Sequence, residues 1–209
     1  MSTLLDELRD CYRKERGHLI LRMLALDSLR PHPDVLREIC NEIGVDVPTG
    51  EVFGAPDFHL DWIEEALHSV SKKTRPTAVR TQRDTDYLIA FDSAEVSHLV
   101  LVEAKGDSYW SNRQLMEKSC RWKELFGENR ELWPGVVPHL VLMSPQRPQR
   151  LCFAHWPTWT KAKIDAGTLE MTQPLHWIRL SMPDRKPACR LPRGKSVDAA
   201  TDKEPIPIS

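Results

Sequence analysis

The stretch Leu99-Val100-Leu101-Val102-Glu103-Ala104-Lys105 decides how this chain folds. Four β-favouring residues in succession predict a buried strand. Because side chains alternate along a strand, Glu103 and Lys105 share one face while Ala104 lies on the other. A carboxylate and an ammonium group at the end of an apolar strand are costly to bury without partners or a function. The stretch therefore predicts a central strand with a candidate site at its end.

A second apolar strand precedes this one along the chain. It comprises Tyr87-Leu88-Ile89-Ala90-Phe91 and begins after Asp86. An Asp on one strand and a Glu-x-Lys on the next are suited to divalent-metal and phosphodiester chemistry. Asp84 lies on the same face as Asp86 and is the rival for its role. Asp86 is favoured because it leads directly into the apolar run.

The remaining chain predicts helices around these strands. Helical periodicity covers residues 3–30 and then a second helix capped by Asp34, before a Gly- and Pro-rich loop over 45–57. From Phe58 onward we expect a helix over 60–70, strands over 77–82, 86–91 and 98–104, a helix over 111–126, a strand over 137–143, a helix over 158–166 and a strand over 176–182. This order predicts an α/β (α+β) fold, a mixed central β-sheet flanked by helices with an α-β-β-β-α-β core.

Composition divides the chain into three expected parts. Residues 1–50 predict an N-terminal helical extension and residues 51–182 the core. Residues 183–209 contain five prolines and few large apolar side chains, which predicts a disordered tail.

The bulk properties exclude several classes of protein. A hydrophobic content of 41% and a charged content of 28% are typical of soluble globular proteins. No apolar stretch approaches the ~20 residues that span a bilayer, and the N-terminus carries acids where a signal peptide is basic, so we expect a cytoplasmic protein with no membrane partner. Five well-separated cysteines predict free thiols. A net charge of −1 leaves only local patches for nucleic-acid contact.

The order of elements, with Asp86 on one strand and Glu103-Ala104-Lys105 on the next, resembles the PD-(D/E)XK nuclease superfamily over roughly residues 58–145. Thr85 stands where that name has its proline. The resemblance implies that Asp86, Glu103 and the backbone carbonyl of Ala104 bind Mg²⁺ or Mn²⁺, which prefer such hard oxygen ligands. It also implies that Lys105 acts on the nucleophilic water or on the developing charge.

Two helices supply further candidates. Gln114, Lys118 and Arg121 form one stripe of the 111–126 helix. In many superfamily members a Gln on this helix, with a partner four residues later, contacts the site or the DNA phosphate, which implies a catalytic role for Gln114 and phosphate contacts for Lys118 and Arg121. A solvated polar face is the alternative. Members also take an extra metal ligand from the first core helix, and Glu64 is the candidate here; plain surface charge is the other interpretation.

Nucleic-acid contacts are predicted on either side of the two strands. The segment 72–83 carries five basic residues and no acid, so Arg80 and Arg83 are candidates for phosphate contact; a solvated strand edge is the alternative. Trp110 follows Lys105 closely and is the best-placed tryptophan for base stacking.

The leading hypothesis is a Mg²⁺-dependent nuclease in phage defence, restriction or a mobile element. An endonuclease is favoured over an exonuclease, and DNA over RNA. Cleavage of two strands would require two sites, hence a homodimer, and a subunit of a larger complex is the other possibility. The alternative function is a non-catalytic module of the same fold that binds nucleic acid or a protein, which the near-neutral charge favours. A third is a regulator that binds DNA through its N-terminal helices.

Overall fold

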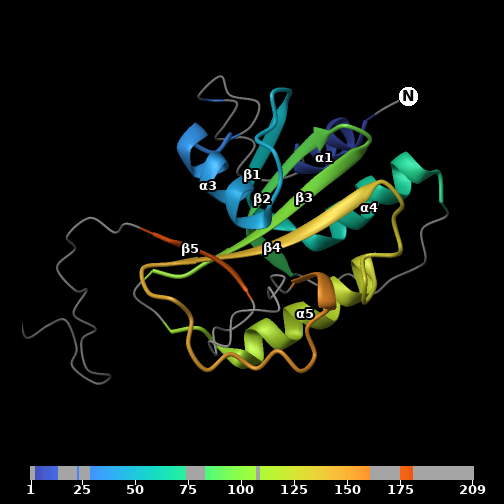
Figure 1. The fold of residues 1–209 in the computed structure, drawn as a ribbon. Helices are drawn as coiled ribbons and strands as arrows, with labels where there is room; N and C mark the ends of the chain where they lie inside the picture. Colours follow the sequence, from blue (N-terminus) through green and yellow to red (C-terminus); the bar gives the residue numbers. More distant parts are fainter. Residues whose placement is uncertain are drawn as a thin grey trace, which may run out of the picture.

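The computed structural model describes residues 3–13, 23, 29–73, 83–106, 109–160 and 175–180 (Figure 1). The elements follow one another as α1 (Leu4–Tyr12), α3 (Pro33–Ile43), β1 (Val52–His59), α4 (Leu60–Ser71), β2 (Asp84–Ser93), β3 (Val96–Ala104), α5 (Asn112–Phe126), β4 (Val136–Ser144), the 3-10 turn η1 (Thr158–Thr160) and β5 (His176–Arg179). None of the helices in these ranges has both the length and the apolar character needed to cross a bilayer.

The described strands form one mixed sheet in the order β1-β2-β3-β4-β5. The first three strands are an antiparallel meander, and β4 and β5 then add in parallel. Helix α5 makes the crossover that two parallel neighbours such as β3 and β4 require. The predicted mixed α+β architecture is therefore confirmed.

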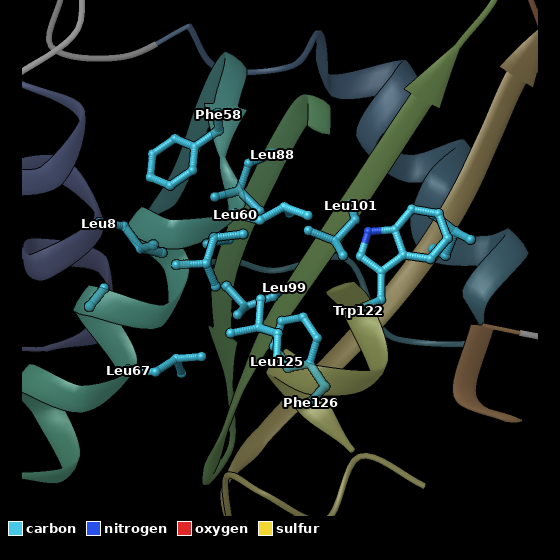
Figure 2. Close-up of a cluster of buried hydrophobic side chains, with 14 of the residues drawn as sticks. Leu8, Phe58, Leu60, Leu67, Leu88, Leu99, Leu101, Trp122, Leu125 and Phe126 are labelled. Carbon is cyan, nitrogen blue, oxygen red and sulfur yellow. The ribbon is translucent and has the colours of Figure 1, made fainter. Parts of the chain in front are cut away.

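Helices cover both faces of the sheet. Helices α1, α4 and α5 pack on the face that carries Leu88, Leu99 and Leu101, and Figure 2 shows Trp122 and Phe126 of α5 pointing into this core. Helix α3 packs on the opposite face. Alternation along the strands separates the two cores, so a side chain's parity decides which helices it meets.

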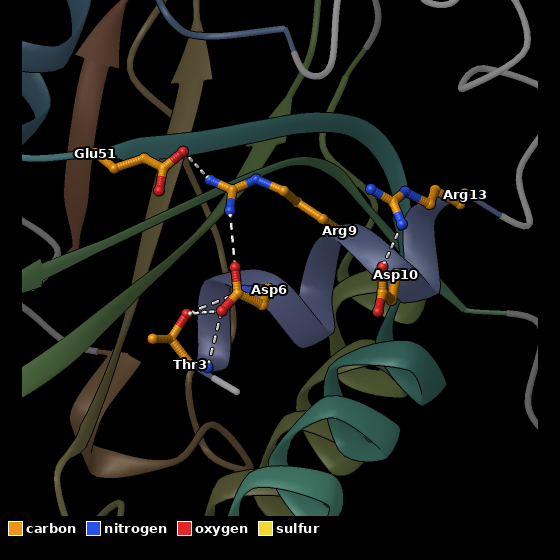
Figure 3. Close-up of polar contacts among 6 residues, drawn as sticks. All are labelled: Thr3, Asp6, Arg9, Asp10, Arg13 and Glu51. Carbon is orange, nitrogen blue, oxygen red and sulfur yellow. Dashed lines mark hydrogen bonds and ion pairs between the residues drawn. The ribbon is translucent and has the colours of Figure 1, made fainter. Parts of the chain in front are cut away.

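Side-chain caps set the start of the N-terminal helix (Figure 3). Asp6 N–H donates to Thr3 Oγ1 at 3.2 Å, and Thr3 N–H donates to Asp6 Oδ2 at 3.0 Å, a reciprocal capping box. Arg9 then bridges Asp6 and Glu51. These contacts tie α1 to the segment that enters β1.

The first strand of the meander differs from the prediction. Residues 52–57 were expected in a loop because of Gly54 and Pro56, but they belong to β1. Among the described strands, β1 lies at the edge of the sheet and pairs with β2, and this position tolerates a proline because the Pro56 nitrogen need not donate to a second neighbouring strand. The strand predicted over 77–82 lies outside the described residues.

The other predicted elements are reproduced with shifted ends. His32 rather than Asp34 caps α3, and its Nδ1 accepts from Asp34 N–H at 3.3 Å because Pro33 already occupies the first helical position. Of the predicted 158–166 helix, only the turn Thr158–Thr160 lies in the described ranges. Most of residues 14–28 and the whole 183–209 tail lie outside them.

Candidate active site

A cavity of about 280 Å³ opens where β2 and β3 meet helix α5. The residues that line it include Asp86, Glu103, Lys105, Gln114 and Lys118, all predicted for the site. Arg83, Asp84 and Trp110 line it as well. The structure thus brings together most of the predicted residues from segments spread over some 35 positions of the chain.

The sheet opens between β2 and β3 at this point. The antiparallel ladder ends at the pair Tyr87–Val102. Beyond it, Thr85 Oγ1 donates to the Val102 carbonyl at 2.9 Å, and Ala104 N–H donates to Asp86 Oδ2 at 2.7 Å. Side chains of β2 therefore satisfy the backbone groups that its main chain no longer reaches, and this fixes the Asp86 carboxylate beside the end of β3.

Glu103 is the deepest charged group of the cavity, with only 3% of its surface exposed. Its Oε2 accepts from Lys118 Nζ at 2.5 Å. Its Oε1 is buried and has no hydrogen-bond partner among the described residues. A buried, unpartnered carboxylate oxygen costs free energy unless something else satisfies it.

Burial raises the pKa of Glu103 to about 7. The negative charge of Asp86 adds to this increase, whereas the Lys118 and Lys105 ammonium groups oppose it. These interactions indicate that two carboxylates and two amines share a small, poorly solvated volume.

Lys105 and Gln114 reach the cavity from the ends of their elements. Lys105 N–H still donates to the Met143 carbonyl at 2.8 Å, so the backbone remains extended beside β4 and Lys105 keeps the parity of Glu103. Gln114 lies in the first turn of α5, where its N–H donates to the capping Ser111 Oγ at 3.4 Å. The cavity therefore includes the amide-bearing end of a helix.

Arg83 and Trp110 are held at the rim of the cavity. Arg83 Nη1 donates to the Glu117 carbonyl of α5. Trp110 Nε1 donates to Ser144 Oγ at 3.4 Å, and Trp177 Nε1 donates to the same oxygen at 3.0 Å. Sequence reasoning did not identify Ser144, because nothing in its neighbourhood along the chain signals that two indoles converge on it.

Glu64 and Arg121 are not at this site, which corrects both predictions. Arg121 Nη2 lies 2.8 Å from Asp61 Oδ1 and 2.8 Å from Glu64 Oε2, and all three side chains are buried between α4 and α5. Two buried carboxylates require a cation, and Arg121 supplies it. Glu64 is therefore not placed as a metal ligand, nor Arg121 as a phosphate contact. Arg80 lies outside the described residues.

The donor set limits which cation the cavity suits. Within the described ranges, no group of three or more His, Cys, Asp or Glu side chains is arranged to hold a metal ion. Asp84 and Glu117 also line the cavity, and the pair of ligands predicted for the cation is Asp86 and Glu103. Mg²⁺ is usually bound through one or two carboxylates and keeps several waters, so this pair and the unpartnered Glu103 Oε1 fit it, provided that Lys118 moves from Oε2 or shares it.

No family model, curated protein or solved structure matches this chain. The function is therefore argued from the chemistry of the cavity.

Proposed function

We propose that this protein is a Mg²⁺-dependent nuclease that hydrolyses phosphodiester bonds, with DNA as its substrate and internal bonds as its target. The observation that carries the proposal is the Glu103 carboxylate, which is buried in a cavity with Asp86 and Lys105 and has one oxygen without a hydrogen-bond partner among the described residues. Buried acids beside a lysine in a cleft are typical of catalytic sites, because each group alters the protonation of the others.

In this proposal, the acidic side chains bind the cation and the lysine and glutamine side chains contact the phosphate. Bound Mg²⁺ supplies Lewis-acid activation of the phosphate and of a water molecule. Asp86 and Glu103 hold the cation, and the Ala104 N–H keeps Asp86 oriented. Lys105 is a point charge that stabilises the negative charge developing on the phosphate oxygens. Gln114, exposed at the start of α5, donates its amide N–H to the phosphate and positions it.

The second candidate function is a non-catalytic module that binds nucleic acid or a protein. One observation favours it: Lys118 already pairs with Glu103, and within the described residues no group of three His, Cys, Asp or Glu side chains is arranged to hold a metal ion. In such a module the ammonium group would permanently replace the cation. Oligonucleotide binding without cleavage, across several metals and substrates, would support this function over the first.

The test is cleavage of plasmid, single-stranded circular DNA and RNA with Mg²⁺, Mn²⁺ or EDTA. We expect metal-dependent cleavage that falls by about 10²-fold or more in Asp86→Asn, Glu103→Gln and Lys105→Met, because each change removes a group in contact with the reacting phosphate or its cation. Lys123→Met is the matched control, since Lys123 lies on α5 outside the cavity and pairs with Glu128. Cleavage that is unchanged in all three site variants would show that it does not come from this cavity.

A further inference from the structure

A second cavity of about 570 Å³ adjoins the first, and Trp110 lines both. Its lining residues follow β3 and β4: Gly106, Tyr109 and Trp110 come after β3, and the other lining residues run from Ser144, at the end of β4, to Arg150. Because β3 and β4 are parallel, the segments that follow them leave the sheet at the same end of these two strands. The second cavity therefore extends the candidate active site along that end of the strands.

The second cavity has a distinctive composition. Its lining includes Arg147, Arg150, Gln146 and Gln149, and none of its described lining residues is acidic. The whole chain carries a net charge of −1, so this is a local concentration of cations and amides. Arginine and glutamine side chains favour a ligand that carries phosphates and hydrogen-bonding edges.

Aromatic side chains are the other component. Tyr109 is 97% exposed, so its ring is available to a ligand. Trp110 and Trp177 are oriented by the shared Ser144 hydroxyl, and the Arg147 guanidinium lies 5.7 Å from the centre of the Trp177 ring. Aromatic faces interleaved with arginines bind unpaired bases, because every base offers a π-face for stacking.

We propose that the two cavities form one path for single-stranded nucleic acid. This rests on the proposed function and names the substrate class of the same site. The strand stacks bases on Tyr109 and Trp110, lays its phosphates along Arg147 and Arg150, and bends one phosphate into the small cavity toward Glu103.

Burial of Glu103 favours a single strand over a duplex. Glu103 is only 3% exposed at the bottom of a cavity of about 280 Å³. A flexible strand can turn one phosphate inward, whereas a duplex is stiff and presents its phosphates on a convex surface. Its bases are also paired and stacked on one another, so they are not available to the aromatic side chains.

Binding is measured by fluorescence anisotropy on the full chain carrying Glu103→Gln, without metal, so that cleavage cannot interfere. The probes are a labelled single-stranded DNA, the RNA of the same sequence and the matching duplex. We expect at least tenfold tighter binding of a single strand than of the duplex. Tyr109→Ala should weaken single-strand binding by roughly 5- to 150-fold, the range for loss of one stacked base. Arg147→Gln should weaken it and reduce the salt dependence by about one phosphate contact.

Arg37→Gln is the matched control, because Arg37 is exposed on α3 and pairs with Asp34 on the opposite face of the sheet. Tyr109 lies outside the core, so its removal leaves the fold intact. Duplex binding as tight as single-strand binding, or single-strand affinity unchanged in both variants, would overturn the path even if the enzyme cleaves. If the wild type cleaves nothing but single-strand binding depends on Tyr109 and Arg147, then the nuclease proposal fails and the path stands.

Discussion

At Glu103, burial and the two neighbouring ammonium groups shift the pKa in opposite directions. Burial raises its pKa, while Lys118 and Lys105 lower it, and the balance is a pKa of about 7. A cation can bind through this carboxylate only after its proton has left. The protonation of one residue should therefore control whether the cavity takes a metal near neutral pH.

The first prediction concerns Mn²⁺ affinity as a function of pH. Titration calorimetry between pH 5.5 and 8.5 should show affinity rising about tenfold per pH unit below pH 7 and levelling off above it, because one proton competes with the cation. Lys118→Met removes the nearest opposing charge, so it should move the midpoint to higher pH. Glu103→Gln should abolish the binding, and a pH-independent affinity in the wild type would contradict the prediction.

The same pKa sets the sign of a stability effect. The folded pKa of about 7 lies above the reference value of 4.5, so the contribution to stability is full below pH 4.5 and is lost as the pH rises to about 7. In the metal-free protein, the unfolding free energy should fall less between pH 4.5 and pH 8 in Glu103→Gln than in the wild type. Denaturant unfolding at these two pH values measures the difference.

The alternation of side chains along the strands predicted which residues form the centre of the site, but not which residues the surrounding side chains contact. Asp86, Glu103 and Lys105 follow from alternation along two adjacent strands, which depends on local sequence alone. The pairing of Arg121 with Asp61 joins residues 60 positions apart, and helical periodicity says which stripe a residue occupies, not which helix covers it. Lys118 was predicted to contact phosphate; its contact with Glu103 likewise depends on how α5 crosses the sheet.

Helix α5 shows two roles for its polar side chains. Its first two turns carry Gln114 and Lys118 to the cavity. Further along, Arg121 turns into the interface with α4, where it is 5% exposed. Gln114, Lys118 and Arg121 all lie near one stripe of the helix surface, so their different roles come from what each turn of the helix faces.

A substitution at Arg121 should separate the structural role from a substrate contact. We expect Arg121→Met to lower the unfolding free energy by about 3–5 kcal/mol, because Asp61 and Glu64 would remain buried without a cation. Arg113→Met on the same helix should leave it nearly unchanged, since Arg113 and Glu117 form an exposed pair. Guanidinium unfolding measures both. Weaker nucleic-acid binding by Arg121→Met at unchanged stability would contradict the structural role.

Among the strands, β1 is the one that the sequence did not predict. Gly54 and Pro56 leave β1 without a continuous apolar run like those that identify β2 and β3, and the strand forms through its pairing with β2. Long apolar runs and capped helices, in contrast, were predictable because their signals are local.

At the scale of the whole molecule, the N-terminal helices are part of the core. Leu4, Leu5, Leu8 and Tyr12 of α1 are buried in the same cluster as the sheet residues, and α1 packs against α4. Helix α3 covers the other face. The sheet that carries the site is therefore covered on both faces only when these N-terminal segments are folded. We expect the site to be disrupted when they unfold.

Leu8→Ala tests whether this enclosure is cooperative. Leu8 is fully buried, so its truncation should lower the unfolding free energy by about 2–5 kcal/mol through lost burial and the cavity left behind. Leu132→Ala is the matched control, because Leu132 is 41% exposed and its truncation should change little. Tryptophan fluorescence, which reports on Trp122 and Trp156 in the core, and far-UV circular dichroism should give one coincident transition that moves as a whole to lower denaturant concentration. Early loss of helical signal with an unmoved tryptophan transition would instead show that α1 unfolds as a separate appendage and that the sheet holds its site without it.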